Sequence, residues 1–177
     1  FTNLKRFLEL VPIIASRLIG VEGSLLVPFH SDGRVWKEQL YLSSTNKFNG
    51  LLLKVSEFSE GSKVGFASNE NQILMMDKLV QNNLPNGGIF ATSLIARGRE
   101  FGRLYVFDPY SPLAWSEANR KNLQLIADLA AVAIENDLFL QETRRHESVD
   151  RQLSIGAEIQ SQLLPDRCPV IEGIELA

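Results

Sequence analysis

The sequence predicts an α+β fold in which helices cover an antiparallel sheet and one long helix ends the domain. Apolar residues in Leu4–Leu18 recur at steps of three and four, which indicates one face of a helix. The apolar runs Ile89–Ala96 and Phe101–Phe107 flank a short polar turn and predict a hairpin. A second helical pattern starts at Ser116. Strands enclosed by helices in this order are typical of an α+β domain.

The first third of the chain is regular enough to divide into elements. We expect the first helix to end at Gly20, because glycine suits the residue that follows a helix. Gly23–His30 is rich in Leu and Val and predicts a strand. Ser31–Gly33 has the composition of a hairpin turn, and Arg34–Leu42 then predicts a second strand.

The middle of the chain has a weaker pattern. Asn46–Glu57 mixes apolar and polar residues without a firm period. We expect a short helix to begin near Ser59 and to run to Asn69. Gln72–Met76 (QILMM) is a short apolar run that suits a buried strand. Asn82–Gly88 contains asparagine, proline and glycine, and we expect a loop there.

The last helical pattern is long. Ser116 suits the N-cap, and the side chains expected to face the sheet are Leu123, Ile126, Ala127, Ala130, Ala133 and Ile134. No proline lies between Pro112 and Pro165, so a helix as far as Leu164 would span on the order of 70 Å. Because this length exceeds one small domain, we expect its distal half to pair with a partner, as in a homodimer.

Composition narrows the class of protein. The chain has 45% hydrophobic and 22% charged residues, as ordinary folded proteins do. A net charge of −3 argues against a nucleic-acid partner. No stretch reaches the roughly 18 apolar residues of a membrane span. The chain opens on Phe1 and stops in a strand-like segment, so we expect it to be part of a longer protein.

Few residues suggest chemistry. Cys168 is the single cysteine, which excludes a disulfide within the chain and favours a reducing, cytoplasmic compartment. His30 and His146 lie far apart in sequence, so we expect no metal site. Gly98–Gly102 lies between two strands and opens no helix, which favours a hairpin turn over a phosphate cradle. We expect Asp166 to be a solvated turn residue.

Three stretches resemble GAF domains when taken in order. Gly61–Leu79 (GSKVGFASNENQILMMDKL) resembles the middle of the family, with Asp77 as its acidic residue. Ser93–Asp108 resembles its paired strands. Leu123–Asp137 resembles its C-terminal helix, in which AIEN (residues 133–136) is characteristic. The resemblance covers Leu4–Leu140 and implies a GAF-like sheet in a sensory domain over residues 1–140.

The C-terminal end resembles a different family. Gly156-x-x-Ile-Gln-x-x-Leu-Leu-Pro165 is similar to the segment that leads into the SpoIIE/RsbU-like class of PPM protein serine phosphatases. Gly156 and Ala157 replace the Ala-Arg pair usual there. The resemblance implies a linker or signalling helix over residues 141–164 and the truncated start of the phosphatase domain over residues 165–177. It places the aspartates that bind Mn or Mg beyond Ala177, so we expect no catalysis and no cofactor in this chain.

GAF domains can bind small ligands between the sheet and the helices and loops on one side. The resemblance implies a candidate lining of Phe58, Phe66, Met75, Met76, Asp77 and Phe90. The alternative is that these side chains only fill the core. Asn46–Asn49 resembles only the first half of a motif of cyclic-nucleotide GAF domains, and the acidic residues of that motif are absent.

The function expected from these resemblances is regulatory. A GAF sensor would control a phosphatase through the long helix in a dimer, and the whole protein would dephosphorylate a phosphoserine on a partner such as an anti-sigma-factor antagonist. Two alternatives stay open. The GAF domain could be a dimerisation module without a ligand, or the helix could lead to a histidine kinase or a nucleotide cyclase.

Overall fold

The computed structural model describes residues 2–30, 32–61, 70–84, 88–108 and 116–163 of the chain. The chain divides into two units, Phe1–Asp137 and Leu138–Ala177. The elements in order are α1 (Thr2–Ile19), β1 (Gly23–Pro28), the 3-10 helix η1 (Lys37–Gln39), β2 (Tyr41–Leu42), α2 (Thr45–Gly61), α3 (Glu70–Asn82), β3 (Gly88–Ala96), β4 (Arg99–Asp108) and α4 (Glu117–Leu163).

The first unit contains a four-stranded antiparallel sheet in the order β2-β1-β4-β3. The two central strands, β1 and β4, pair from Gly23↔Phe107 to Pro28↔Gly102. At Gly102 the φ angle is 156°, and an added Cβ would lie 2.5 Å from the carbonyl oxygen of Val27. Only glycine allows this close approach of the two strands. The α+β prediction is confirmed.

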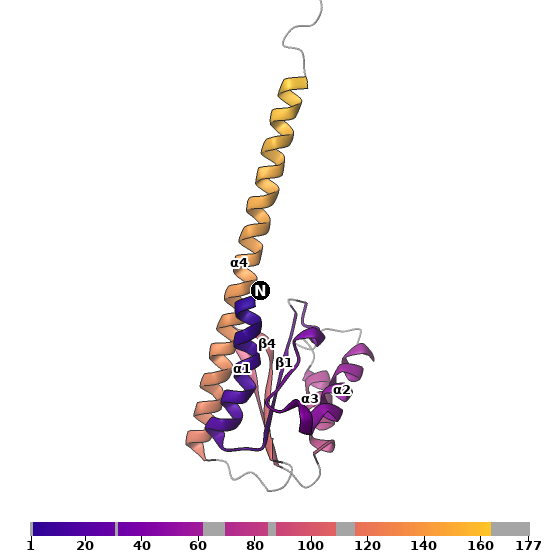
Figure 1. Ribbon diagram of the computed structural model, residues 1–177, viewed down its shortest axis with the longest axis vertical. Helices are drawn as coiled ribbons and strands as arrows, with labels where there is room; N and C mark the ends of the chain where they lie inside the picture. Colours follow the sequence, from indigo (N-terminus) through magenta and orange to yellow (C-terminus); the bar gives the residue numbers. More distant parts are fainter. Residues whose placement is uncertain (1, 31, 62–69, 85–87, 109–115, 164–177) are drawn as a thin grey trace, which may run out of the picture. The chain divides into compact units, whose positions relative to one another are not determined.

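Helices cover both faces of this sheet. Helix α1 and the N-terminal part of α4 lie on one face, and α2 and α3 lie on the other (Figure 1). Side chains alternate between the faces along each strand. On β4, Tyr105 and Phe107 belong to the core on the α2/α3 side. Leu104 and Val106 are also buried and face the α1/α4 side.

Helix α1 ends as the sequence predicts. Gly20 has a φ of 78°, and the N–H groups of Gly20 and Val21 both bond to the carbonyl oxygen of Ser16. Glycine adopts this left-handed conformation without the steric cost that a Cβ would add. The following strand, β1, begins at Gly23, so this part of the prediction is confirmed.

The β3–β4 hairpin and the start of α4 are also confirmed. Arg97 and Gly98 form the turn with positive φ angles of 48° and 77°. The N–H of Asn119 donates to Oγ of Ser116 at 3.0 Å, which is the N-cap bond. The buried residues of α4 are those predicted, except that Ala131 is buried and Ala133 is only half-buried.

The strand predicted at Gln72–Met76 is wrong, because these residues lie inside α3. Met76 and Val80 are fully buried four residues apart, whereas Leu74 and Met75 are more than half exposed. This is a helical burial pattern. A five-residue apolar run carries no period of its own, so the run suited a strand and a buried helix equally well.

The second strand was also predicted too long. Instead of one strand over Arg34–Leu42, a single bridge joins Phe29 to Val35, followed by η1 and the two-residue β2. Asn46–Glu57, which shows no clear period, lies in α2, where Phe48 interrupts the helical angles with a φ of −125°. Ser59–Gly61 end α2, and the rest of the short helix expected there falls outside the described residues.

The second unit is described from Leu138 to Leu163 as the continuation of α4. Every side chain from Glu142 to Leu163 is exposed. None of the described helices is both long and apolar enough to cross a membrane.

Candidate functional site

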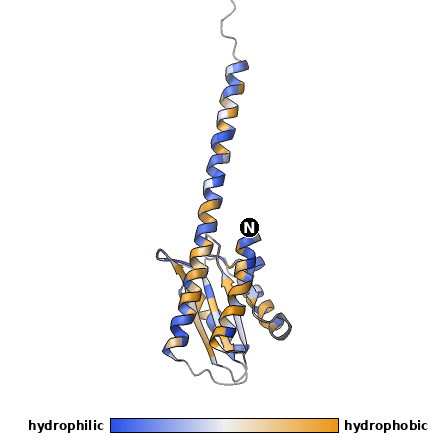
Figure 2. Ribbon diagram, turned by 60° about the vertical axis from the view of Figure 1, so that its left-hand side comes forward, coloured by the Kyte–Doolittle hydropathy of each residue, from blue (hydrophilic) through white to orange (hydrophobic). Residues whose placement is uncertain are grey.

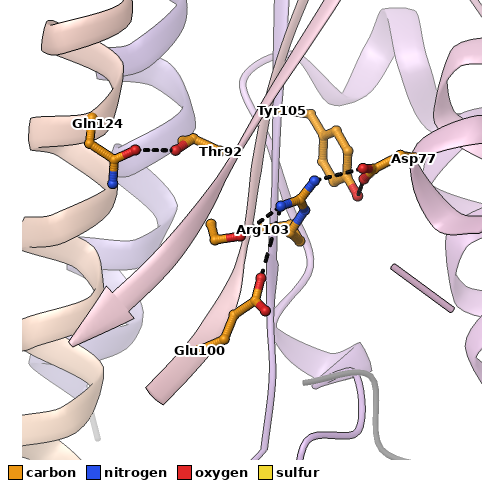
Figure 3. A network of polar contacts seen from close by, with 7 residues as sticks. Asp77, Thr92, Glu100, Arg103, Tyr105 and Gln124 are labelled. Atoms are coloured by element: carbon orange, nitrogen blue, oxygen red, sulfur yellow. Dashed lines mark hydrogen bonds and ion pairs between the residues drawn. The ribbon is translucent and has the colours of Figure 1, made fainter. Parts of the chain in front are cut away.

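A polar network joins α3 to the central strand β4 (Figure 3). Nη2 of Arg103 donates to Oδ2 of Asp77 at 2.6 Å, and the hydroxyl of Tyr105 donates to Oδ1 of the same carboxylate at 2.6 Å. Nη1 of Arg103 donates to Oγ of Ser93 at 2.6 Å. Its distance to Oε1 of Glu100 is 4.0 Å. One carboxylate of α3 is thus held by two side chains of β4.

Local structure explains how these groups meet. Arg103 and Tyr105 are two residues apart on β4, so both side chains project from the α2/α3 face of the sheet. Asp77 directly follows Met76, whose side chain is fully buried against that face. The apolar packing of α3 therefore fixes the position of the carboxylate over the strand.

The network is largely shielded from water. The side chains of Arg103, Glu100 and Asp77 are 14%, 16% and 28% exposed. Burial lowers the pKa of Arg103, but the neighbouring Tyr105 and Asp77 more than offset it, so the pKa is raised and the guanidinium stays charged. Burial, and then the charge of Asp77, hold the pKa of Tyr105 well above its usual value of 10. Tyr105 therefore remains a hydrogen-bond donor.

Two polar atoms of the network have no hydrogen-bond partner among the residues that the structure describes. Nε of Arg103 and Oε1 of Glu100 are buried and make no hydrogen bond, although Oε1 of Glu100 forms the 4.0 Å ion pair with Nη1 of Arg103. Such atoms are uncommon in folded proteins, because each costs about 1–3 kcal/mol of unfolding free energy if it stays unpaired. Together they offer one donor and one acceptor to a small polar ligand or a water molecule. The arrangement suits binding and orientation.

The sequence-predicted lining residues do not all meet at this network. Asp77 is part of it, and Met76 and Phe58 pack in the core of the same face. Met75 is 58% exposed on the outer side of α3. Phe90 lies under the guanidinium of Arg120 from α4, at 5.4 Å. That contact places it on the opposite face of the sheet.

Phe66 lies outside the described residues. The candidate pocket as a whole stays a prediction, with Met76, Asp77 and Phe58 as the members that share one face.

Arg103 and Tyr105 are the residues that sequence reasoning missed. A signal was available, because Arg103 is a charged residue inside an otherwise apolar strand, between Phe101 and Leu104. A charge at such a position normally requires a buried partner. The identity of that partner, 26 residues away on α3, follows only from the tertiary structure.

On the opposite face of the sheet, a hydrogen bond joins β3 to α4. Oγ1 of Thr92 on β3 donates to Oε1 of Gln124 on α4 at 2.6 Å (Figure 3). Gln124 in turn donates to Asp128 at 2.8 Å. These groups are uncharged or exposed, so they orient α4 without forming a charged site.

Within the described residues, no cluster of three or more His, Cys, Asp or Glu side chains could hold a metal ion. His30 packs near the ring of Trp36, at 5.1 Å between centroids. His146 lies 4.0 Å from Glu142 on α4. The two histidines therefore have separate structural surroundings.

Solved structures with a similar fold are GAF domains. One is the blue-light absorbing form of the PixJ GAF domain of Thermosynechococcus elongatus, which is 14% identical to this chain. The match covers 82% of this chain and 92% of the PixJ chain, with a TM-score of 0.52. A second is the photoproduct state of GAF3 from Slr1393 of Synechocystis sp. PCC6803, which is also 14% identical. The match covers 79% of this chain and 98% of the GAF3 chain, with a TM-score of 0.55. A third is the GAF domain of the cyanobacteriochrome TePixJ, which is 12% identical. The match covers 76% of this chain and 91% of the TePixJ chain, with a TM-score of 0.53.

No family model matches the sequence. No curated protein matches it either. At these identities the likeness concerns the fold, and the chain has a GAF-like fold: a four-stranded antiparallel sheet with helices and a long C-terminal helix.

Proposed function

We propose, from its GAF-like fold, that the chain is the cytoplasmic sensor and dimerisation part of a metal-dependent protein serine phosphatase in bacterial signalling. The observation that carries the proposal is α4. It runs unbroken from the sheet through 47 residues, and its last turns contain Ile159, Gln160 and Leu163 of the phosphatase-like motif. One helix thus joins the GAF-like fold to the residues that resemble the phosphatase motif.

The sensing step would use the network under α3. A ligand with a polar group directed at Arg103 and Glu100 would pair their unsatisfied atoms, and it would compete with or reinforce the bond to Asp77. Because Asp77 belongs to α3, occupancy would change how firmly this helix packs on β4. A ligand shifts a conformational equilibrium only if it binds the two states differently, and this exchange supplies such a difference.

The output step would use α4. Its residues from Glu142 to Leu163 are exposed and include Val149, Leu153, Ile155 and Ile159, so they suit pairing with a second copy. We propose a homodimer through this helix, in which a change of helix packing biases the phosphatase domain. Mn or Mg would be bound in that domain, and the substrate would be a phosphoserine protein such as an anti-sigma-factor antagonist.

The PixJ GAF domain has a blue-light absorbing form, but light absorption is not part of the function proposed for this chain. GAF domains that hold a bilin covalently attach it through cysteine. The single cysteine of this chain is Cys168, which lies outside residues 1–140.

A ligand screen tests the sensor half of the proposal. Candidate small polar ligands, cyclic nucleotides included, are added to the 177-residue chain, and the midpoint of thermal unfolding is followed. A ligand that binds the native state must raise that midpoint. We expect Arg103→Met to abolish the rise and Met75→Ala to retain it, because Met75 lies outside the network. No rise with any ligand would favour a module that only dimerises.

Extension of the coding sequence tests the output half. We expect an acidic residue on an early strand after Ala177, and manganese-dependent release of phosphate from a phosphoserine protein by the extended chain. The 177-residue chain should show no turnover under the same conditions. A kinase or cyclase sequence after Ala177 would overturn the phosphatase output and leave the sensor half standing.

A further inference from the structure

Two consecutive hydroxyl side chains on β3 contact opposite sides of the sheet. Apolar residues predominate in the strands (Figure 2), and Thr92 and Ser93 are the polar residues within β3. Oγ of Ser93 accepts a hydrogen bond from Nη1 of Arg103 at 2.6 Å, and Oγ1 of Thr92 donates one to Oε1 of Gln124 at 2.6 Å. Because consecutive side chains of a strand point to opposite faces, the pair reaches both the candidate site and α4.

Each of these two contacts continues into a helix. On the α2/α3 face, Nη2 of Arg103 donates to Oδ2 of Asp77 on α3 at 2.6 Å. On the α1/α4 face, Nε2 of Gln124 donates to Oδ1 of Asp128, one turn further along α4, at 2.8 Å. Figure 3 shows Asp77 and Arg103 on one side of the strands and Gln124 on the other. A continuous series of polar contacts thus runs from α3 to α4, and it crosses the sheet at the two hydroxyl residues.

Helix α4 follows β3 along its length. The guanidinium of Arg120 lies 5.4 Å from the ring centroid of Phe90, and Nε of Arg97, just after β3, lies 3.5 Å from Oε2 of Glu135. The span 90–97 measures about 23 Å at about 3.3 Å per strand residue. The span 120–135 measures about 22 Å at about 1.5 Å per helical residue. Since the two lengths agree, the helix lies beside the strand in one register, and the contact in the middle of this interface depends on that register.

The crossing point lies next to an irregularity in the sheet. Ser93 is opposite Arg103 in the pairing of β3 with β4, and Leu94 is opposite Gly102. The register shifts directly afterwards, between Leu94 and Ile95. Such an irregularity lets a strand bend and change its twist locally. A change of twist here moves both hydroxyl groups together, because consecutive residues of the backbone carry them.

We propose that Ser93 and Thr92 are positioning residues that transmit occupancy of the candidate site to α4. The inference rests on the sensing step proposed above. A ligand that accepts a hydrogen bond from Nε of Arg103, or that displaces Asp77, changes the position of the guanidinium and with it the bond to Ser93. The backbone then carries the change to Thr92, whose bond to Gln124 alters the position of α4 against β3. The twist of β3 is the element whose two arrangements the site and the helix both distinguish.

The side-chain amide of Gln124 allows a direct measurement by NMR. Its NH₂ signals in the isotope-labelled chain are assigned from their loss in Gln124→Ala. Asp77→Asn changes the site without altering β3 or α4. We expect it to shift the Gln124 signals and to leave those of Gln152, on the exposed part of α4, in place. Lys78→Met, which changes an exposed charge beside Asp77 on α3, is the control and should shift neither.

Variants of Ser93 test the crossing point itself. In the Ser93→Ala background, Asp77→Asn should no longer shift the Gln124 signals, because the bond from Arg103 to the hydroxyl is gone. In the Ser93→Thr background, which keeps a hydroxyl, the shift should return. Thermal unfolding shows that each variant is folded at the temperature of the measurement. Tyr105→Phe, which removes one bond to Asp77 and no charge, is a second and milder change in the site.

Two results would overturn the proposal. One is unchanged Gln124 signals in both Asp77→Asn and Tyr105→Phe. The other is a shift as large in the Ser93→Ala background as in the parent chain, since the change would then reach α4 by another route. Either result leaves the sensing step standing, because the ligand screen measures binding directly. If no ligand raises the unfolding midpoint while the Gln124 signals still shift, the sensing step fails and the coupling of the two faces stands.

Discussion

The two faces of the sheet are held to their helices by different interactions. On the α2/α3 face, a charged network of Asp77, Arg103 and Tyr105 supplements the apolar core. On the α1/α4 face, buried aliphatic and alanine side chains dominate, and a hydrogen bond joins Thr92 of β3 to Gln124 of α4. Directional bonds can be exchanged for a ligand's bonds, whereas close packing of small residues cannot. The difference suits the first face to sensing and the second to a fixed mechanical connection.

The largest effect should come from the apolar part of the α2/α3 face. Met76→Ala removes a fully buried side chain and should lower the unfolding free energy by about 2–4 kcal/mol. The neighbouring Met75→Ala should cost less than about 0.5 kcal/mol, since that side chain is mostly exposed. Urea denaturation of both variants measures the difference. Similar losses would mean that α3 does not present Met76 alone to the core.

Loss of the charged network should cause the next largest decrease in unfolding free energy. Asp77→Asn leaves the mostly buried Arg103 with only the 4.0 Å ion pair to Glu100. We expect it to cost about 2 kcal/mol, less than a fully buried pair because Asp77 is partly exposed. The double variant Asp77→Asn/Arg103→Met should recover part of this loss, because the buried charge that lost its hydrogen-bonded partner is then gone. A double-mutant cycle by urea denaturation checks the coupling. Strictly additive losses would reject the ion pair as the cause.

Each face also contains a tyrosine whose pKa is raised. Burial, and then Glu9, raise the pKa of Tyr41 on the α1/α4 face to about 12. Burial, and then Asp77, raise that of Tyr105 on the other face. The unfolded value is about 10. Below pH 10 both states keep the proton, and stability is unaffected by these groups.

Above pH 10 the unfolded chain loses these protons first. The unfolding free energy should then fall by about 1.4 kcal/mol per pH unit for each tyrosine, until its folded pKa is reached. Urea denaturation between pH 8 and 11 measures the slope. Tyr41→Phe should remove the contribution of Tyr41 to this slope, and Tyr105→Phe should remove that of Tyr105. The two variants therefore compare the two faces directly. An unchanged slope in either variant would show that the tyrosine in question is not protected.

The smallest effect should come from the polar contact of the α1/α4 face. Thr92→Val keeps the shape of the side chain and removes the hydroxyl that bonds Gln124. We expect a loss of less than about 1 kcal/mol, since Gln124 is exposed and water can replace the lost bond. Thermal unfolding, with Gln124→Ala as the companion variant, measures it. A loss as large as that of Asp77→Asn would remove the contrast between the faces.

Most of the framework could be predicted from the sequence. The structure confirms three predictions that rest on neighbouring residues: the helical period of Leu4–Leu18, the β3–β4 hairpin and the cap at Ser116. Such local patterns do not depend on how distant parts of the chain pack. The errors fell on Arg34–Leu42 and Gln72–Met76. In both stretches the pattern was too short to give a period, so packing against the sheet decided the outcome.

The candidate site divides in the same way. The sequence alone suggested Asp77 as a candidate through its resemblance to a family motif, because such motifs depend on residue type and order. It could not pair Asp77 with Arg103 and Tyr105, or place Phe90 on the opposite face, because those relations join residues that are distant in the chain. The sequence alone predicted α1, β1, the β3–β4 hairpin and the start of α4, and it shows which residues carry charge. Only the tertiary structure decided which charges meet, since a buried ion pair depends on how α3 packs across the sheet.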